Sequence, residues 1–268
     1  MNTYRAGVLV LGSLLWDNSN GRKVWREHYF GENFQSQIID IKVPTRYGRY
    51  SQGRKCPTVV LSSAYLRDQN FGTAKFIPFK NQKMNFQELI CSARDLSEAE
   101  GSSSRGFVKG GTIKWCIITC LLSNNFDSEE KEHFLDKWAD NYTDEITEEF
   151  VGIFKMDTEE ESIISNKGNL KLKWSDSLSN FDLILATQTK PRKAIHDSSD
   201  YLNSTDLASQ IFGKPEYFVK NKLNGISTPE DFEIIDVLKG KPTLELRENA
   251  INDGCLEIEI DNFIQNYL

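Results

Sequence analysis

The chain has 268 residues, with apolar residues near two-fifths and charged residues near a quarter, values that are typical of a globular protein and argue against disorder. The net charge of −7 argues against non-specific binding of nucleic acid over the whole surface, because phosphate attraction needs a surplus of Lys and Arg. The charge is uneven, however. Residues 1–60 hold nine Lys and Arg against four Asp and Glu. This locally basic part is suited to a small acidic ligand.

The cysteine and histidine pattern predicts neither disulfides nor a metal site. The five cysteines are odd in number and contain no Cys-x-x-Cys pair, which favours a reducing cytoplasm. The three histidines lie far apart, without a ligand-type spacing. No stretch is apolar for long enough to span a bilayer. We therefore expect a cytoplasmic protein with no metal, no cofactor and no membrane association.

The stretch Gly7–Asp17 is the most informative part of the N-terminal region. Four apolar residues from Val8 onward predict a strand that is covered on both faces. Gly12 and Ser13 then end it, and a glycine lets the backbone turn sharply. Successive main-chain N–H groups can then point at one ligand oxygen, which would make Gly12, Ser13 and Leu14 an anion cradle. The alternative is that Gly12-Ser13 is only a tight turn after a first core strand.

Two arginines follow the next predicted strand, residues 37–43. The segment Thr45–Ser51 alternates them with tyrosines and contains Arg46 and Arg49. A guanidinium presents a flat fork of donors, so both residues are candidate carboxylate contacts. A solvated edge strand with its charges directed outward explains the same pattern.

A helix is predicted from Asn85, which can cap it together with Glu88. Apolar residues recur at intervals of three and four residues from Phe86 to Leu96. With a helical rotation of about 100° per residue, Glu100 falls on the same apolar face. A carboxyl group there should have its pKa raised toward the range useful to a general base, and Gly101 would end the helix. In the alternative, the helix ends near Leu96 and Glu100 is an exposed loop acid.

The remainder is predicted to be a mixture of helices and strands. Residues 112–122 form a long apolar strand that we expect beside the first strand, and we place a division there, with a first domain over residues 1–122 and an α/β extension over residues 123–268. Within the extension, the patterns predict a buried strand over residues 181–187, helices over residues 202–217 and from residue 228 to Gly240, and a final strand carrying Leu256, Ile258 and Ile260.

The Gly12-Ser13-Leu14 loop after an apolar strand, together with Glu100-Gly101 after a helix end, resembles the γ-glutamylcyclotransferase-like superfamily, which includes BtrG-type enzymes. Members carry a Tyr-Gly-Ser-Leu or Tyr-Gly-Ser-Asn loop and a glutamate in a Glu-Gly pair. The likeness covers roughly residues 6–122. It departs from the pattern at Leu11, where members have an aromatic residue. The resemblance implies an α+β fold in which a small mixed β-barrel or sheet is flanked by helices.

The resemblance also implies an activity. The loop would hold the glutamyl end of a γ-glutamyl-linked small molecule, and Glu100 would act as acid and base. The products would be 5-oxoproline and a free amine or amino acid. The alternative is a non-catalytic or regulatory protein of the same fold that binds a small ligand or, through its C-terminal half, a protein partner. An RNA- or nucleotide-binding module is disfavoured by the acidic remainder of the chain.

Overall fold

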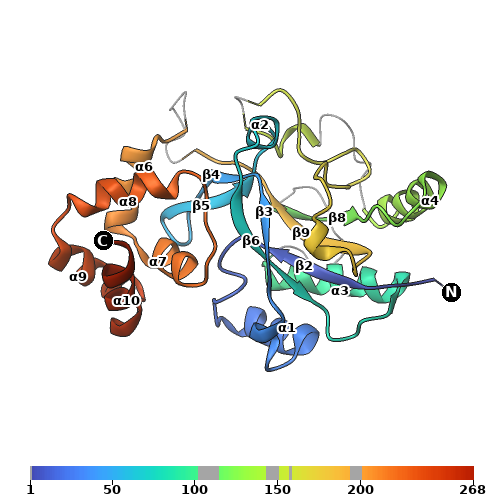
Figure 1. Cartoon of the computed structure of the whole chain (residues 1–268), viewed down its shortest axis with the longest axis horizontal. Coiled ribbons are helices and arrows are strands. Elements are labelled where there is room, and N and C mark those ends of the chain that lie inside the picture. Colours follow the sequence, from blue (N-terminus) through green and yellow to red (C-terminus); the bar gives the residue numbers. More distant parts are fainter. Residues whose placement is uncertain (1, 102–114, 143–150, 157–158, 194–200) are drawn as a thin grey trace.

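A five-stranded sheet lies at the centre of the computed structural model, which describes residues 2–101, 115–142, 151–156, 159–193 and 201–268 (Figure 1). Its strand order is β3-β6-β2-β9-β8. The bounds are Ile39–Val43 for β3, Gly72–Pro78 for β6, Ala6–Val10 for β2, Leu183–Thr189 for β9 and Cys116–Leu122 for β8. β2 runs antiparallel to β6 and parallel to β9, and all five of its residues are buried, as the apolar run predicts.

Two helices cover one face of this sheet. They are α1, Asn20–Phe30, and α3, Phe86–Ala99, which lie against each other (Figure 1). Leu89, Ile90 and Leu96 of α3 are fully buried in the core that also holds the central strands. The helical period that predicts α3 therefore identifies its packed face correctly.

The sheet uses strands from both sides of the predicted division at residue 122. β9 follows that residue in the chain, yet it lies between β2 and β8. The expectation that β8 would lie beside the first strand is therefore wrong, because β9 occupies that position and pairs with both. Since β2 and β9 are parallel, their C-terminal ends meet at the same edge of the sheet, where ligands bind in many α/β proteins.

The remaining described strands form two small sheets. β4, Thr45–Ser51, pairs with β5, Cys56–Leu61, and β1, Thr3–Tyr4, pairs with β7, Met84–Asn85. Short helices α2, Ser63–Arg67, and α4, Ser128–Ala139, complete this part, with 3-10 turns at Phe34–Gln37 and Asp176–Leu178. The fold is thus mixed α+β, and the strands of the described ranges form open sheets rather than a closed barrel.

The C-terminal region is helical and has its own hydrophobic core. Its helices are α6, Ser204–Gly213, α7, Glu216–Leu223, α8, Asp231–Lys239, α9, Thr243–Asp253, and α10, Glu257–Tyr267. They pack together beside β4 and β5, and the core they form includes Tyr47 and Val59 from those strands (Figure 1). No helix in the ranges described above is long and apolar enough to cross a membrane.

The predicted final strand over residues 256–260 is wrong, because these residues begin α10. The Glu259 carboxylate accepts a hydrogen bond from the Leu256 amide at 2.7 Å, a contact typical of a helix start. Only Ile260 of the alternating residues is buried, and Phe263 is buried one turn later. The helical spacing of this pair, not the alternation before it, decides the local structure.

The helical register of α10 can be tested with two isoleucine substitutions. Ile260→Ala should lower the free energy of unfolding by about 2–5 kcal/mol, because the side chain is fully buried. Ile258→Ala should change it by less than about 0.5 kcal/mol, because that side chain is 63% exposed. Urea denaturation of the two variants measures the difference, and similar large losses at both positions would contradict the helical register.

Candidate functional site

Glu100 stands at the C-terminal end of α3, directly after its last helical residue. The helix begins with the predicted capping box of Asn85 and Glu88 and continues through Ala99. Gly101 follows with φ +73°, a left-handed conformation that favours glycine. The side chain of Glu100 is only 9% exposed. The alternative in which the helix ends near Leu96 and Glu100 is an exposed loop acid is therefore wrong.

The loop after β2 is a series of tight turns. The Leu15 amide donates to the Gly12 carbonyl at 3.0 Å, and the Asp17 amide donates to the Ser13 carbonyl at 2.8 Å. The amides of Gly12, Ser13 and Leu14 donate to no acceptor in the described part of the chain. These three N–H groups remain available to a ligand, as an anion cradle requires.

The buried side chain of Arg26, from α1, holds this loop in place. Its guanidinium donates to the backbone carbonyls of Leu14 at 2.8 Å and Asp17 at 2.7 Å, and to the side-chain oxygen of Asn18 at 2.6 Å. Burial lowers the pKa of Arg26, and the nearby charge of Asp17 opposes that shift. The carbonyl groups of Leu14 and Asp17 are therefore directed toward α1.

The glycine at position 12 is explained by a close approach rather than by its backbone angles. Its φ lies outside the left-handed region. A Cβ atom at this position would lie 2.3 Å from the Tyr217 hydroxyl and 3.0 Å from the ring carbon that carries it. A sharp turn is thus not what requires glycine at position 12. The close packing of Tyr217 requires it instead. Tyr217 belongs to α7, so the C-terminal helices help to build the site.

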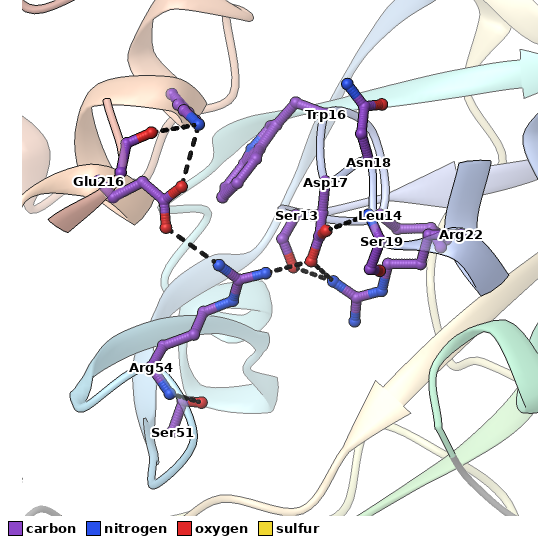
Figure 2. Close-up of polar contacts among 12 residues, drawn as sticks. Ser13, Leu14, Trp16, Asp17, Asn18, Ser19, Arg22, Ser51, Arg54 and Glu216 are labelled. Carbon is purple, nitrogen blue, oxygen red and sulfur yellow. Dashed lines mark hydrogen bonds and ion pairs between the residues drawn. The ribbon is translucent and has the colours of Figure 1, made fainter. Parts of the chain in front are cut away.

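Arg22 connects the loop to Glu100. Its guanidinium lies 2.5 Å from Glu100 Oε2, 2.6 Å from Ser13 Oγ and 2.9 Å from Asp17 Oδ2. The contacts of Arg22 with Ser13 and Asp17 are visible in Figure 2. The Arg22 side chain is 13% exposed, so these charges interact in a partly dry environment where they are poorly screened.

The ionic contacts continue from Asp17 into the C-terminal helices. Arg54 pairs with Asp17 and lies 3.3 Å from Glu216 (Figure 2). Lys220 contacts the same Glu216 carboxylate at 2.9 Å. The guanidinium of Arg54 and the ammonium of Lys220 both lie about 5 Å from the centre of the Trp16 ring. Opposite charges thus alternate from Glu100 to Lys220 and hold the loop between α3 and α7.

A pocket of about 430 Å³ opens at the edge where β2 and β9 end. Glu100 and the loop residues Gly12, Ser13 and Leu14 all line it. The cations that line it are Arg22, Arg49, Arg54 and Arg192. Thr187 and Thr189 from β9 complete one wall. The buried Thr189 hydroxyl has no hydrogen-bond partner in the described residues, and the buried Thr187 hydroxyl makes none at ordinary geometry, although it lies close enough to the Glu100 carboxyl group to lower its pKa. The pocket therefore combines an excess of positive charge with unpaired donors and one lining carboxylate.

Five of the six predicted site residues meet in this pocket, and Arg46 does not. Arg46 lies 3.7 Å from the Glu230 carboxylate, stacks over the Tyr65 ring at 4.9 Å and lines a separate surface groove. The segment Thr45–Ser51 is also not a solvated edge strand, since Tyr47 is only 4% exposed and its hydroxyl contacts Asp231 at 3.3 Å. Of the two predicted arginine contacts, only Arg49 faces the pocket.

The pKa values of Glu100, which lines the pocket, and of Asp17, which shares Arg22 with it, are shifted in opposite directions. Burial raises the pKa of Glu100, although the adjacent positive charge of Arg22 works in the opposite direction. The pKa of Asp17 is lowered: burial would raise it, but a hydrogen bond from the Ser19 amide and the charges of Arg22 and Arg54 prevail. Glu100 is thus the carboxylate better suited to exchanging a proton near neutral pH.

Sequence reasoning missed Arg22, Thr187, Thr189 and Tyr217. Arg22 lies in a polar segment whose pattern indicates only a short helix. The threonines continue an apolar strand whose neighbour in space is more than 170 residues earlier in the chain. Their place beside the loop could have been inferred only with a correct strand order.

No protein-family model matches the chain, and no curated protein and no solved structure matches it. The described residues contain no group of three or more His, Cys, Asp or Glu side chains that could hold a metal ion.

The packing role of Gly12 can be measured directly. Gly12→Ala should lower the free energy of unfolding by about 1–3 kcal/mol, because the new methyl group overlaps the buried Tyr217 hydroxyl. The control is Gly53→Ala, since a Cβ at that position meets no atom within 4 Å. Tyr217→Phe should recover part of the loss in the Gly12→Ala background, because the closest contact disappears. Equal stability of the Gly12→Ala and Gly53→Ala proteins would contradict this explanation.

The role of Arg22 should be visible as a pH dependence of stability. In Arg22→Met, the pKa of Glu100 rises further and that of Asp17 is no longer held down by Arg22. Folded Glu100 then retains its proton to higher pH than unfolded Glu100, so the stability of the variant relative to wild type falls as pH rises. We expect a deficit of about 3 kcal/mol at pH 8 and a smaller one near pH 4.

Chemical denaturation across this pH range measures the effect. Adding Glu100→Gln to Arg22→Met should flatten the pH dependence and leave only the contribution of Asp17. The exposed Arg67, substituted by Met, is the control and should show no pH-dependent deficit. A deficit for Arg22→Met that is equal at pH 4 and pH 8 would contradict the proposed pairing.

Proposed function

We propose that this pocket binds a γ-glutamyl-linked small molecule and releases 5-oxoproline from it, as in the γ-glutamylcyclotransferase-like superfamily that the sequence resembles. One observation carries the proposal. The Gly12–Leu14 loop and Glu100, about 90 residues apart in the chain, line the same pocket, and Arg22 contacts both Ser13 and Glu100. Two short motifs that a family likeness would bring together are thus adjacent in this fold.

The pocket offers complementary partners for both charges of an α-amino acid group. An α-carboxylate can accept hydrogen bonds from the free amides of Gly12, Ser13 and Leu14 in a site with surplus positive charge. An α-ammonium group requires an acceptor, and Glu100 is the carboxylate that lines the pocket in the described chain. Its Oε2 atom is held by Arg22, and its Oε1 atom accepts no hydrogen bond from a described residue. Oε1 is therefore the atom assigned to the ligand.

The reaction moves two protons from the attacking nitrogen to the leaving nitrogen, because an α-ammonium group carries three hydrogens and the ring nitrogen of 5-oxoproline keeps one. Glu100 accepts a proton from the α-ammonium group, and the free α-amine attacks the γ-carbonyl carbon. A carbon–nitrogen bond forms to close the five-membered ring, and the bond from the γ-carbon to the leaving nitrogen breaks. Protonated Glu100 gives its first proton to that nitrogen as the bond breaks, and it then carries the second proton from the ring nitrogen to the released amine. Atoms and charges thus balance without a cofactor or water. The raised pKa of Glu100 suits it to both steps.

Unpaired hydrogen-bond donors can stabilise the negative charge that develops on the γ-carbonyl oxygen. Thr187 lies beside the Glu100 carboxyl group, and its hydroxyl has no hydrogen-bond partner at ordinary geometry. A donor already directed into a partly dry pocket costs no reorganisation when charge develops. We assign Thr187 to this position in the proposed reaction.

The contact between Glu100 and Arg22 favours the second candidate function, a non-catalytic ligand-binding protein. A carboxylate that shares a buried ion pair is also a structural element, and the pocket would bind an acidic small molecule without any proton transfer. The two functions make different predictions for Glu100→Gln. Catalysis requires the carboxylate for turnover, whereas binding alone requires only that Arg22 remain in position.

Turnover can be tested by detecting 5-oxoproline by mass spectrometry after incubation with a pool of γ-glutamyl amines and γ-glutamyl amino acids. We expect product from the wild type, a loss of at least 100-fold in Glu100→Gln, and full activity in Glu98→Gln. Glu98 is the matched control because it lies on the exposed side of the same helix end. Turnover that survives in Glu100→Gln would exclude the proposed base.

The absence of product from any substrate, combined with a ligand-dependent rise in melting temperature, would favour the binding protein instead. Thr187→Val adds an independent test of the proposed reaction. It should lower kcat with little change in KM, because the hydroxyl acts on charge that develops only during the reaction. An unchanged kcat would remove Thr187 from the mechanism.

A further inference from the structure

We propose that Arg49, Thr189 and Trp115 form a second oxyanion subsite in the same pocket, separate from the Gly12–Leu14 loop, that receives a terminal carboxylate or phosphate of the ligand. The pocket would then bind molecules with two acidic groups, one at each subsite. This binding does not require catalysis. Only the assignment of the second acidic group to the leaving part of a γ-glutamyl molecule rests on the proposed function.

Among the described residues, Arg49 is held in place without an acidic partner. Its guanidinium lies over the Trp115 ring at 5.2 Å and donates one hydrogen bond, of 2.7 Å, to the carbonyl of Lys190. No carboxylate in the described residues pairs with it, whereas Arg22 and Arg54 each contact two. One edge of a fixed, planar fork of donors is therefore available to an oxyanion.

The surroundings of Arg49 add donors and positive charge. Thr189 lines the pocket, and its buried hydroxyl has no hydrogen-bond partner in the described chain. Arg192 forms a β-bridge with Arg49, and its side chain also lines the pocket. Burial lowers the pKa of Arg49, and the charge of Arg192 lowers it further. A bound anion would offset the cost of burying the Arg49 guanidinium.

The spacing along β9 separates the two subsites. Thr187 lies beside Glu100, which Arg22 connects to Ser13 of the loop subsite, and Thr189 is the next residue on the same face of the strand. Successive residues on one face of a strand are about 7 Å apart. A ligand that reaches both subsites must therefore carry its two charged ends several bonds apart, which a short aliphatic diacid can do.

Binding of unbranched diacids tests the subsite. Isothermal titration calorimetry would compare glutarate, adipate and pimelate with the monocarboxylate hexanoate. We expect at least one diacid to bind the wild type at least tenfold more tightly than hexanoate. Arg49→Met should remove this advantage, Thr189→Val should reduce it severalfold, and Arg67→Met, at an exposed position outside the pocket, should leave it unchanged.

One further ligand and one further variant complete the test. An ω-phosphonocarboxylate of matched length shows which acidic group the second subsite prefers. If it binds more tightly than the diacid, and this gain depends on Arg49, the subsite takes a phosphate-type group. If it binds more weakly, the subsite takes a carboxylate. Arg49→Lys retains the charge without the planar fork and tests the subsite if Arg49→Met fails to fold. Absence of diacid preference in the wild type, or equal diacid affinity in wild type, Arg49→Met and Arg49→Lys, would overturn the proposal. Diacid preference without 5-oxoproline formation would retain the subsite and reject catalysis.

Discussion

The candidate site depends on three side-chain contacts of one partly buried guanidinium. Arg22 of α1 holds Ser13 from the loop after β2, Asp17 from the end of that loop and Glu100 from the end of α3. The loop and the distant end of α3 are thus fixed to α1 by a group whose donors have a rigid geometry. Because removal of one member of a buried charged set leaves the others unpaired, these positions constrain one another. The shape of the pocket and the charge state of Glu100 follow from the same contacts.

The C-terminal helices are part of this arrangement and not an addition to it. Tyr217 of α7 packs so closely on the loop that only glycine fits at position 12. Glu216 continues the ionic contacts through Arg54 to Asp17 (Figure 2). β9, also from the second half of the chain, supplies the threonine wall of the pocket. A site suggested by motifs in the first 122 residues is therefore completed by residues beyond them.

The sequence predicted the features that depend on short-range patterns. The cap at Asn85, the apolar face of α3 and the stop at Gly101 are all encoded within 17 residues, so Glu100 could be assigned correctly to the buried face. Long-range features were not predictable in this way. The insertion of β9 between β2 and β8 depends on pairing between distant strands, and Arg22 has no local signal that marks it. The alternation before Ile260 was misleading because three residues fit both a strand and a helix start.

The central claim is that the loop amides and Glu100 bind two ends of one α-amino acid group. A crystal structure of the protein soaked with 5-oxoproline, the proposed product, tests this most directly. The account predicts the carboxylate of 5-oxoproline within 3.2 Å of at least two of the amides of Gly12, Ser13 and Leu14, and its ring N–H directed at Glu100 Oε1. Well-ordered 5-oxoproline bound elsewhere, or a pocket that remains empty at saturating concentration, would contradict it.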